Sequence, residues 1–236
     1  MTYQDAKELF KKIKIELSEN EYEKLSAYET LLLGWNEKIN LTAITDDYDI
    51  WLKHFVDSCT LNSYISSNSN IIDVGTGAGF PSIPIKIMNN SIKLTLLDSL
   101  NKRIDFLKDV CEKLSLDNIN FVHGRAEDVA HDNNHREIYD IAVARAVANL
   151  ATLAEYCLPF VKKDGVFLCM KAGNCEEEIE NGKNSIKELG GKIEKIDKFF
   201  LPDGVNERTI IVIKKINNTK NVYPRKAGTP SKKPIE

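Results

Sequence analysis

The sequence predicts an α/β protein with a mostly parallel seven-stranded sheet, an antiparallel last strand and an N-terminal helical extension. Two patterns support this. From residue 70 onward, short apolar runs alternate with helix-like stretches, as in βαβ units whose helices cover both faces of a sheet. Before residue 67, apolar residues recur at three- and four-residue steps, as on one face of a helix. We therefore expect a helical region (1–66), an α/β domain (67–216) and a basic tail (217–236).

The helical region carries an N-terminal helix signal at Ser18 and Glu21, which have the spacing of a capping box. The apolar face of the helix that follows consists of Tyr22, Leu25, Tyr28, Leu32, Trp35 and Ile39. A further helix is expected from Asp49 to Ile65, after a polar connection over 36–47.

The α/β domain predicts strands at 71–74, 93–97, 119–122, 138–144, 165–170, 192–200 and 209–215. Helices are expected at 82–90, 101–114, 149–161 and 175–189. The loop around Pro202, Asp203 and Gly204 is too short to hold a crossover helix. The last two strands should therefore pair antiparallel.

Composition excludes several classes of protein. The chain is 42% hydrophobic and 28% charged, which is too apolar for a disordered chain. No run approaches the roughly 18–20 apolar residues of a membrane span, and the first residues do not resemble a secretory signal. Five cysteines without a C-x-x-C pair disfavour both zinc and a disulfide framework. We expect a cytoplasmic protein with no membrane partner and no metal.

Charge is unevenly distributed along the chain. The net charge is −3, but from Lys214 onward seven basic residues stand against one glutamate, giving +6, so the rest carries −9. A basic tail on an acidic body is suited to a phosphate backbone. The alternative is a solvated tail that only aids solubility.

The most informative motif is a glycine-rich turn over residues 71–81, where a buried strand that carries Asp73 near its end leads to Gly75, Gly77 and Gly79. Glycine allows the backbone to turn tightly and approach a ligand. Dinucleotide-binding loops have the spacing G-x-G-x-x-G, whereas here it is G-x-G-x-G, followed by Phe80. The loop resembles motif I of S-adenosylmethionine-dependent methyltransferases, in which the acidic residue and the glycines contact the amino-acid part of the cofactor.

Other candidate binding residues follow the later strands. Asp98 lies 21 residues beyond Gly77, where an acidic group accepts hydrogen bonds from ribose hydroxyls; its alternative role is a helix N-cap. The segment with Ala126 and Glu127 resembles the one lining the adenine in such methyltransferases. Arg145 follows the next strand, at the sheet edge where open α/β proteins bind ligands.

Taken together, the motifs resemble a single family. The segments WNEKINLTAI (35–44), KHFVDS (53–58), GTGAGFPSIP (75–84), LLDSLNKRIDFL (96–107), HGRAED (123–128), ARAVANL (144–150) and YPRKAGTPSKKPI (223–235) occur in the order found in the RsmG (GidB) family. The resemblance implies a Rossmann-like class I methyltransferase that modifies a guanine N7 in small-subunit (16S) ribosomal RNA. It implies cofactor contacts by Gly75, Phe80, Ala126, Glu127 and Arg145. Ser82 stands where the family pattern suggests a glycine.

The implied reaction needs no general base, because guanine N7 already has an in-plane lone pair. Catalysis should then come from aligning N7, the methyl carbon and the sulfonium sulfur. The candidate residues around the reacting groups are Asn40, His54 and Arg145, with Thr42 beside them. Arg145 is expected to contact the cofactor, a phosphate or guanine O6, and the roles of Asp57 and Ser58 stay open.

The tail residues expected to contact RNA are Tyr223, Arg225, Lys226, Lys232 and Lys233, since lysine and arginine neutralise phosphates and tyrosine stacks on bases. Three other functions remain possible from the residues alone. One is an NAD(P)-dependent oxidoreductase, and another is a non-catalytic RNA-binding or ribosome-assembly protein. The third is a small-molecule methyltransferase, which would not need the basic tail. The oligomeric state cannot be derived from this sequence.

Overall fold

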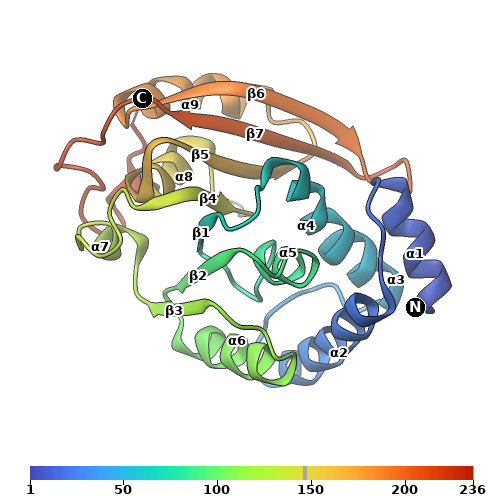
Figure 1. Cartoon of the computed structure of the whole chain (residues 1–236). Helices are drawn as coiled ribbons and strands as arrows, with labels where there is room; N and C mark the ends of the chain where they lie inside the picture. Colours follow the sequence, from blue (N-terminus) through green and yellow to red (C-terminus); the bar gives the residue numbers. More distant parts are fainter. Residues whose placement is uncertain (146–147, 236) are drawn as a thin grey trace.

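The structure, a computed structural model, describes residues 1–145 and 148–235. Its centre is a seven-stranded sheet with the order β3-β2-β1-β4-β5-β7-β6 (Figure 1). The strands are β1 (Asn70–Val74), β2 (Lys93–Asp98), β3 (Ile119–His123), β4 (Tyr139–Ala144), β5 (Val161–Ala172), β6 (Gly191–Phe200) and β7 (Glu207–Lys215).

The sheet has the predicted mixture of directions. β1 through β5 pair in parallel, and β7 lies antiparallel between β5 and β6. The β6–β7 hairpin closes with a hydrogen bond from Leu201 N to Asn206 O, and Gly204 in this loop has a φ of +70°. The strand order reverses between β1 and β4, so the carboxyl ends of these two strands form the crevice in which such sheets bind ligands.

Alternating residues along the strands build two separate cores, one on each face. Ile71, Leu94 and Val143 join the core under the N-terminal helices, α5 (Ser82–Met88) and α6 (Asn101–Lys113). Ile72 and Leu97 point the other way, into the core beneath α8 (Leu150–Cys157) and α9 (Glu176–Glu188). Figure 1 shows both layers. The helices on this second side are α7 (Ala126–Val129), α8 (Leu150–Cys157), the 3₁₀ turn η3 (Leu158–Phe160) and α9 (Glu176–Glu188).

The N-terminal region is helical, as predicted, and packs into the first core. α2 (Glu19–Asn36) begins with the full capping box of Ser18 and Glu21. The helix predicted from Asp49 to Ile65 is instead a series of short α-helical, π-helical and 3₁₀-helical segments that follow one another directly. The remaining elements of this region are α1 (Tyr3–Lys12), α3 (Asp47–Ile50), the π-helix η1 (Trp51–Val56), α4 (Asp57–Cys59) and the 3₁₀ helix η2 (Thr60–Tyr64).

Some predicted boundaries differ from the structure. The helix expected over 149–161 ends at Cys157, because Pro159 lacks the N–H that would continue it. Strand β5 begins earlier and ends later than the predicted 165–170. Ile39 lies beyond the end of α2 but still packs against the core.

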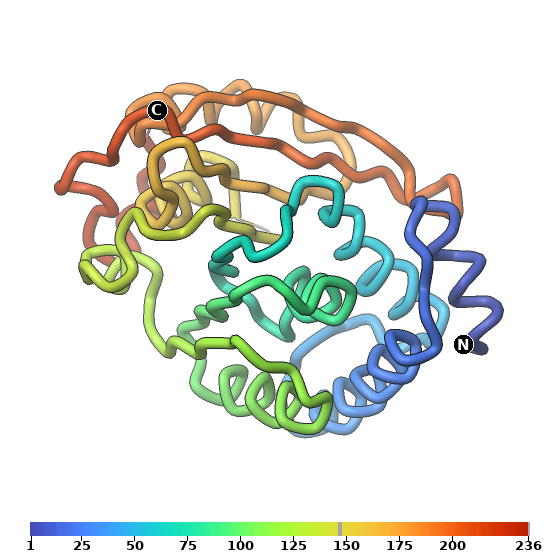
Figure 2. The backbone as a smooth tube through the Cα atoms, viewed as in Figure 1, coloured from blue at the N-terminus to red at the C-terminus, as the bar shows by residue number. Residues whose placement is uncertain are grey.

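The tail lies along the body of the protein instead of forming a free arm. After β7 it returns past α9 and α7 and ends in the short helix α10 (Thr229–Lys232), which contacts α8 (Figure 2). In the described part of the chain, no helix is long and apolar enough to cross a membrane.

Candidate active site

The glycine loop after β1 leaves open space beside its backbone. Gly75 and Gly77 have φ values of +73° and +60°, and a Cβ atom on Gly75 would meet no other atom within 4 Å. Gly79 is different, because a Cβ there would lie 2.7 Å from the Tyr28 hydroxyl and from Ile83. The first two glycines therefore leave room for a ligand, while the third allows close packing.

Asp73 lies at the base of this loop and is fully buried. Its Oδ2 accepts a hydrogen bond of 2.9 Å from the Thr76 hydroxyl, whereas its Oδ1 accepts none of normal geometry from the described residues. Burial raises the pKa of Asp73 to about 7, although the Ser82 and Thr76 hydroxyls oppose this. A fully buried carboxylate beside an open glycine loop fits the ammonium group of S-adenosylmethionine.

Asp98 closes the neighbouring side of the loop at the end of β2. Its Oδ2 accepts from Gly77 N at 2.9 Å and from Arg103 Nη1 at 3.3 Å, and its Oδ1 accepts from Leu100 N at 2.9 Å. The N-cap of α6 is Leu100, so the alternative role of Asp98 as the cap is wrong. A carboxylate oriented in this way keeps lone pairs for ribose hydroxyls.

The predicted adenine wall begins at α7, where Ala126 and Glu127 form the first turn. Glu127 is buried, and its Oε1 accepts a hydrogen bond of 2.8 Å from the backbone of Gly228 in the tail. The tail is thus attached directly to the segment expected to line the adenine.

A cavity of about 550 Å³ lies at the carboxyl ends of β4 and β5. Its polar lining is rich in charge, and Met170, Ala172 and Ile44 supply apolar surface. The charged and polar lining residues are Lys53, His54, Asp57, Arg145, Lys171, Glu178 and Arg208.

Arg145 connects this cavity to the glycine loop. Its guanidinium lies 4.9 Å from the centre of the Phe80 ring and donates to the Lys53 carbonyl at 3.0 Å. His54 stacks on the same ring at 4.3 Å, and its Nδ1 lies 3.1 Å from Arg145 Nη2. The motif residues Phe80, His54 and Arg145 therefore form one wall between the glycine loop and the cavity.

His54 is a neutral hydrogen-bonding residue. Burial, with the nearby positive charge of Arg145, lowers its pKa to about 3. Since Arg145 is only a donor, Nδ1 accepts, and the proton resides on Nε2, which donates to Thr42 Oγ1 at 2.8 Å. The lone pair on Nδ1, which His54 would need to act as a general base, already accepts the hydrogen bond from Arg145.

Asn40 lies apart from this wall. Its side chain is exposed and is not among the residues that line the cavity. The loop around it is instead held by Asn36, which accepts from the backbone amides of Leu41 and Thr42. A direct role for Asn40 stays a prediction.

Sequence reasoning missed several groups of this site. Arg208, from β7, places its Nε 3.1 Å from Asp57 Oδ2. Lys171 donates to the Ala148 carbonyl at 2.5 Å and pairs with Glu178, which fixes the end of the β4–α8 connection. Local periodicity shows only that these residues lie in a strand or helix. Ala146 and Val147 of the ARAVANL motif lie outside the described residues, as does Glu236.

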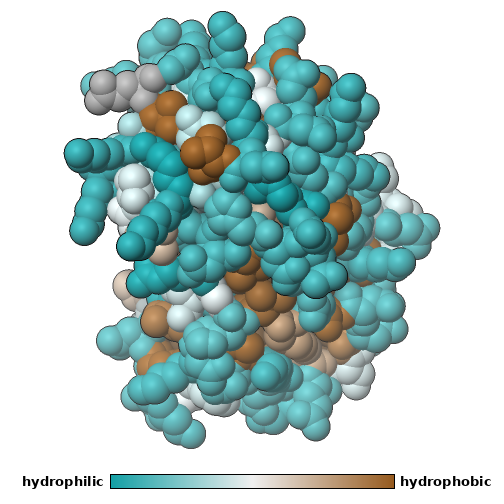
Figure 3. Space-filling view, turned by 90° about the vertical axis from the view of Figure 1, so that its left-hand side faces the viewer, coloured by the Kyte–Doolittle hydropathy of each residue, from teal (hydrophilic) through white to brown (hydrophobic). Residues whose placement is uncertain are grey.

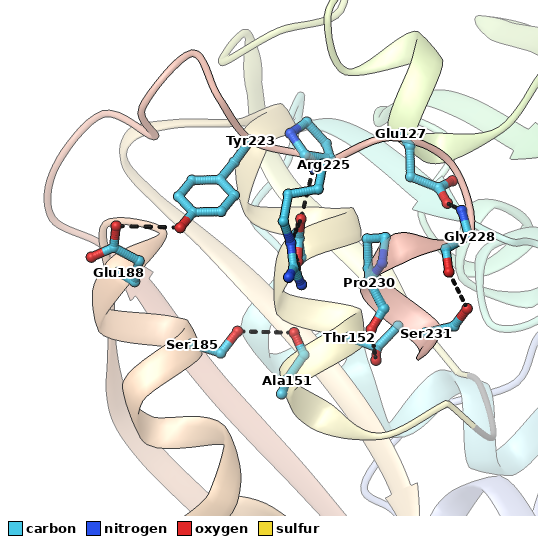
Figure 4. A network of polar contacts seen from close by, with 12 residues as sticks. Glu127, Ala151, Thr152, Ser185, Glu188, Tyr223, Arg225, Gly228, Pro230 and Ser231 are labelled. Carbon is cyan, nitrogen blue, oxygen red and sulfur yellow. Dashed lines mark hydrogen bonds and ion pairs between the residues drawn. The ribbon is translucent and has the colours of Figure 1, made fainter. Parts of the chain in front are cut away.

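The basic tail is held by buried carboxylates and by backbone contacts (Figure 4). Arg225 donates from Nε and Nη2 to Glu155, a fully buried residue of α8, with a shortest distance of 2.7 Å. The Tyr223 hydroxyl lies 3.4 Å from Glu188, and the Thr152 hydroxyl donates to the Pro230 carbonyl.

Arg136 supports the tail from the other side. Its guanidinium donates to the backbone carbonyls of Ala130, Thr219, Lys220 and Tyr223. By contrast, Lys226, Lys232 and Lys233 are exposed. Of the tail residues expected to bind RNA, these three lysines keep free ammonium groups in the described structure, whereas Arg225 is engaged within the protein.

Within the described residues, no cluster of three or more His, Cys, Asp or Glu side chains is arranged to hold a metal ion.

Comparison with known proteins identifies close relatives. The family described as rRNA small subunit methyltransferase G (GidB) matches residues 21–210. A protein of Alkaliphilus metalliredigens named ribosomal RNA small subunit methyltransferase G is 52% identical over 222 residues, covering 93% of both chains. The protein of the same name from Bacillus subtilis is 51% identical over 224 residues, covering 94% of both.

Solved structures show the same fold at much lower identity. The O-methyltransferase from Bacillus cereus in complex with SAH superposes with a TM-score of 0.57 at 15% identity, covering 80% of this chain and 91% of that one. TYW2 from M. jannaschii in complex with AdoMet gives 0.54 at 16%, covering 69% and 76%. These likenesses confirm the class I methyltransferase architecture.

Proposed function

Because this chain belongs to the rRNA small subunit methyltransferase G (GidB) family, we propose that it transfers the methyl group of S-adenosylmethionine to N7 of a guanine in small-subunit (16S) ribosomal RNA. Membership of a methyltransferase family argues against the NAD(P)-dependent oxidoreductase. The open glycine loop and the buried Asp73 carboxylate argue against a vestigial cofactor site.

The observation that favours N7 as the acceptor is the state of His54. Its Nδ1 accepts from Arg145 and its Nε2 proton goes to Thr42, so it cannot remove a proton from the substrate. Guanine N7 carries its lone pair without prior deprotonation. A site whose histidine is already engaged on both ring nitrogens is suited to an acceptor atom that needs no deprotonation, and positioning can lower the barrier by roughly 7–11 kcal/mol.

Asp73, Asp98 and the backbone around Gly75 and Gly77 would hold the cofactor. When bound, S-adenosylmethionine supplies an electrophilic methyl group on a positively charged sulfur. The stacked wall of Phe80, His54 and Arg145 would separate its binding loop from the cavity for the base and exclude water from one side of the reacting groups.

The tail would supply an RNA contact through Lys226, Lys232 and Lys233. These ammonium groups are exposed, and the face of the molecule that carries the tail is mostly hydrophilic (Figure 3). Arg225 would act indirectly, by holding the tail against α8.

Methyl transfer to ribosomal RNA tests this function. The purified protein is incubated with labelled S-adenosylmethionine and small subunits, or their naked RNA, from cells that lack the gene. Mass spectrometry of the digested RNA should find one 7-methylguanosine. A methyl group on a ribose, on an exocyclic amine or on another base would contradict the proposal.

A further inference from the structure

Asp57 is a buried carboxylate in the lining of the substrate cavity whose bonding capacity is only partly used. Its side chain is 4% exposed. Its Oδ2 lies 3.1 Å from Arg208 Nε and 3.4 Å from Arg145 Nη1. Its Oδ1 has no hydrogen-bond partner in the described part of the chain. A buried acceptor left without a donor is destabilising, so in a residue that lines the cavity this oxygen is available to a donor of a ligand.

The surroundings of Asp57 favour a flat, partly polar ligand. The cavity volume of about 550 Å³ is in the range of small-molecule sites. Met170, Ala172 and Ile44 supply apolar surface on which a ring can stack, and the other lining residues are charged or polar. Arg145 and Arg208 compensate the buried negative charge, so the carboxylate remains an acceptor.

Among the RNA bases, guanine best matches a carboxylate acceptor. Guanine presents two adjacent donors, the N1–H and the N2 amino group, on one edge, and N7 lies across the ring system from them. Adenine presents the N1 lone pair at the corresponding place, which would face the carboxylate unfavourably. Guanine held by Asp57 would thus leave N7 free to face the cofactor loop.

We propose that Asp57 selects the target guanine by accepting hydrogen bonds from its N1–H and its N2 amino group. This inference rests on the proposed function, and it makes Asp57 a specificity-determining residue. The χ2 torsion of aspartate is soft, so a small rotation of the carboxylate turns Oδ1 toward the base, and the long side chains of Arg145 and Arg208 follow Oδ2.

The same contact favours the reaction itself. As the methyl group arrives at N7, the guanine ring becomes positively charged and its N1–H becomes more acidic. A hydrogen bond from this group to a carboxylate strengthens as the charge develops, and interactions that strengthen in the transition state increase the rate.

The test removes the N2 amino group from the base and, separately, the carboxylate from Asp57. After the methylated guanine has been located, RNA fragments are prepared with guanine or with inosine at that position; inosine lacks the N2 amino group but keeps N7, O6 and N1–H. The wild-type protein should prefer guanine in kcat/KM by roughly 10- to 100-fold, as expected for a hydrogen bond to a charged group. Asp57→Asn should reduce this preference to about twofold or less.

A matched control is Asp109→Asn on α6, whose carboxylate pairs with Trp35 and Lys113 outside the cavity. It should keep the guanine preference of the wild type. Thermal unfolding and S-adenosylmethionine binding establish that Asp57→Asn is folded. If that variant does not fold, the wild-type comparison of the two bases still decides, because a wild-type protein that methylates both equally well overturns the role of Asp57.

Two further outcomes are distinguishable. If Asp57→Asn slows both substrates by the same factor and keeps the guanine preference, Asp57 is only a structural residue, the inference is wrong and the proposed function stands. If the wild-type protein transfers no methyl group to guanine N7 in ribosomal RNA, the proposed function fails, and the inference fails with it.

Discussion

The ion pair between Arg225 and Glu155 should stabilise the whole protein by attaching the tail to α8. In Arg225→Met the fully buried Glu155 loses the side-chain donors that approach it at 2.7–3.2 Å, and only the Arg225 backbone amide remains. Breaking a buried pair costs about 3–5 kcal/mol. The arginine side chain is 26% exposed, so water replaces part of the loss and we expect about 2–3 kcal/mol.

For a chain of this size, 1 kcal/mol corresponds to a change in Tm of about 2–4 °C, so Arg225→Met should lower the Tm by roughly 4–12 °C. Thermal unfolding followed by circular dichroism measures this. The control is Lys226→Met, which alters an exposed neighbour and should leave the Tm within about 1 °C. Adding Glu155→Gln to Arg225→Met should restore part of the loss. If Arg225→Met and Lys226→Met unfold at the same temperature, the tail is not held in the way described.

Three other perturbations separate the roles of the site residues. Changing Lys226, Lys232 and Lys233 together to alanine should weaken RNA binding and reduce the slope of log K against log salt concentration by about 0.7–0.9 per lost phosphate contact. Calorimetry should show an unchanged S-adenosylmethionine affinity, and an unchanged salt slope would exclude the tail as an RNA contact. Because Asp73 has a raised pKa of about 7 and must ionise to hold an ammonium group, cofactor affinity should rise up to about tenfold per pH unit below pH 7 and level off above it. Asp73→Asn should bind weakly with no such pH dependence, and a wild-type affinity that is constant from pH 5.5 to 8 would contradict the assignment. His54 has a folded-state pKa of about 3, below its ordinary 6.5. Between these pH values only the unfolded chain gains a proton at this residue, so the unfolding free energy should fall as the pH drops below 6.5, by up to about 1.4 kcal/mol per pH unit. Urea unfolding at pH 5 and pH 7 should show a smaller difference for His54→Gln than for the wild type; equal differences would show that His54 is protonated in the folded protein.

Much of the fold could be predicted, because its signals are local. The alternation of apolar runs indicated all seven strands, and the short loop near Gly204 indicated the antiparallel hairpin. The capping box at Ser18 was confirmed in full. The short helices α7 and α10 were missed, since four residues are too few to show a helical period.

Only the site residues that belong to a recognisable sequence motif could be predicted. The glycine loop and Asp98 come together as expected, because the ends of adjacent parallel strands meet at one sheet edge. Arg208 approaches Asp57 from a strand 151 positions later in the chain, and no periodicity reports such a pairing. The ion pair between Arg225 and the buried Glu155 likewise depends on the assembled fold, and counting charges along the sequence treats that arginine as free.

The hydrogen bonds from Arg136 to the tail affect which substitutions this segment tolerates. Its guanidinium holds main-chain carbonyls at Ala130, Thr219, Lys220 and Tyr223, so the route of the polypeptide does not depend on which side chains the intervening positions carry. Substitutions at Asn221 and Val222, both exposed, can therefore accumulate without redirecting the chain. The backbone of this segment is therefore held independently of its exposed side chains. New binding properties can be engineered by changing these side chains without redesigning the rest of the enzyme.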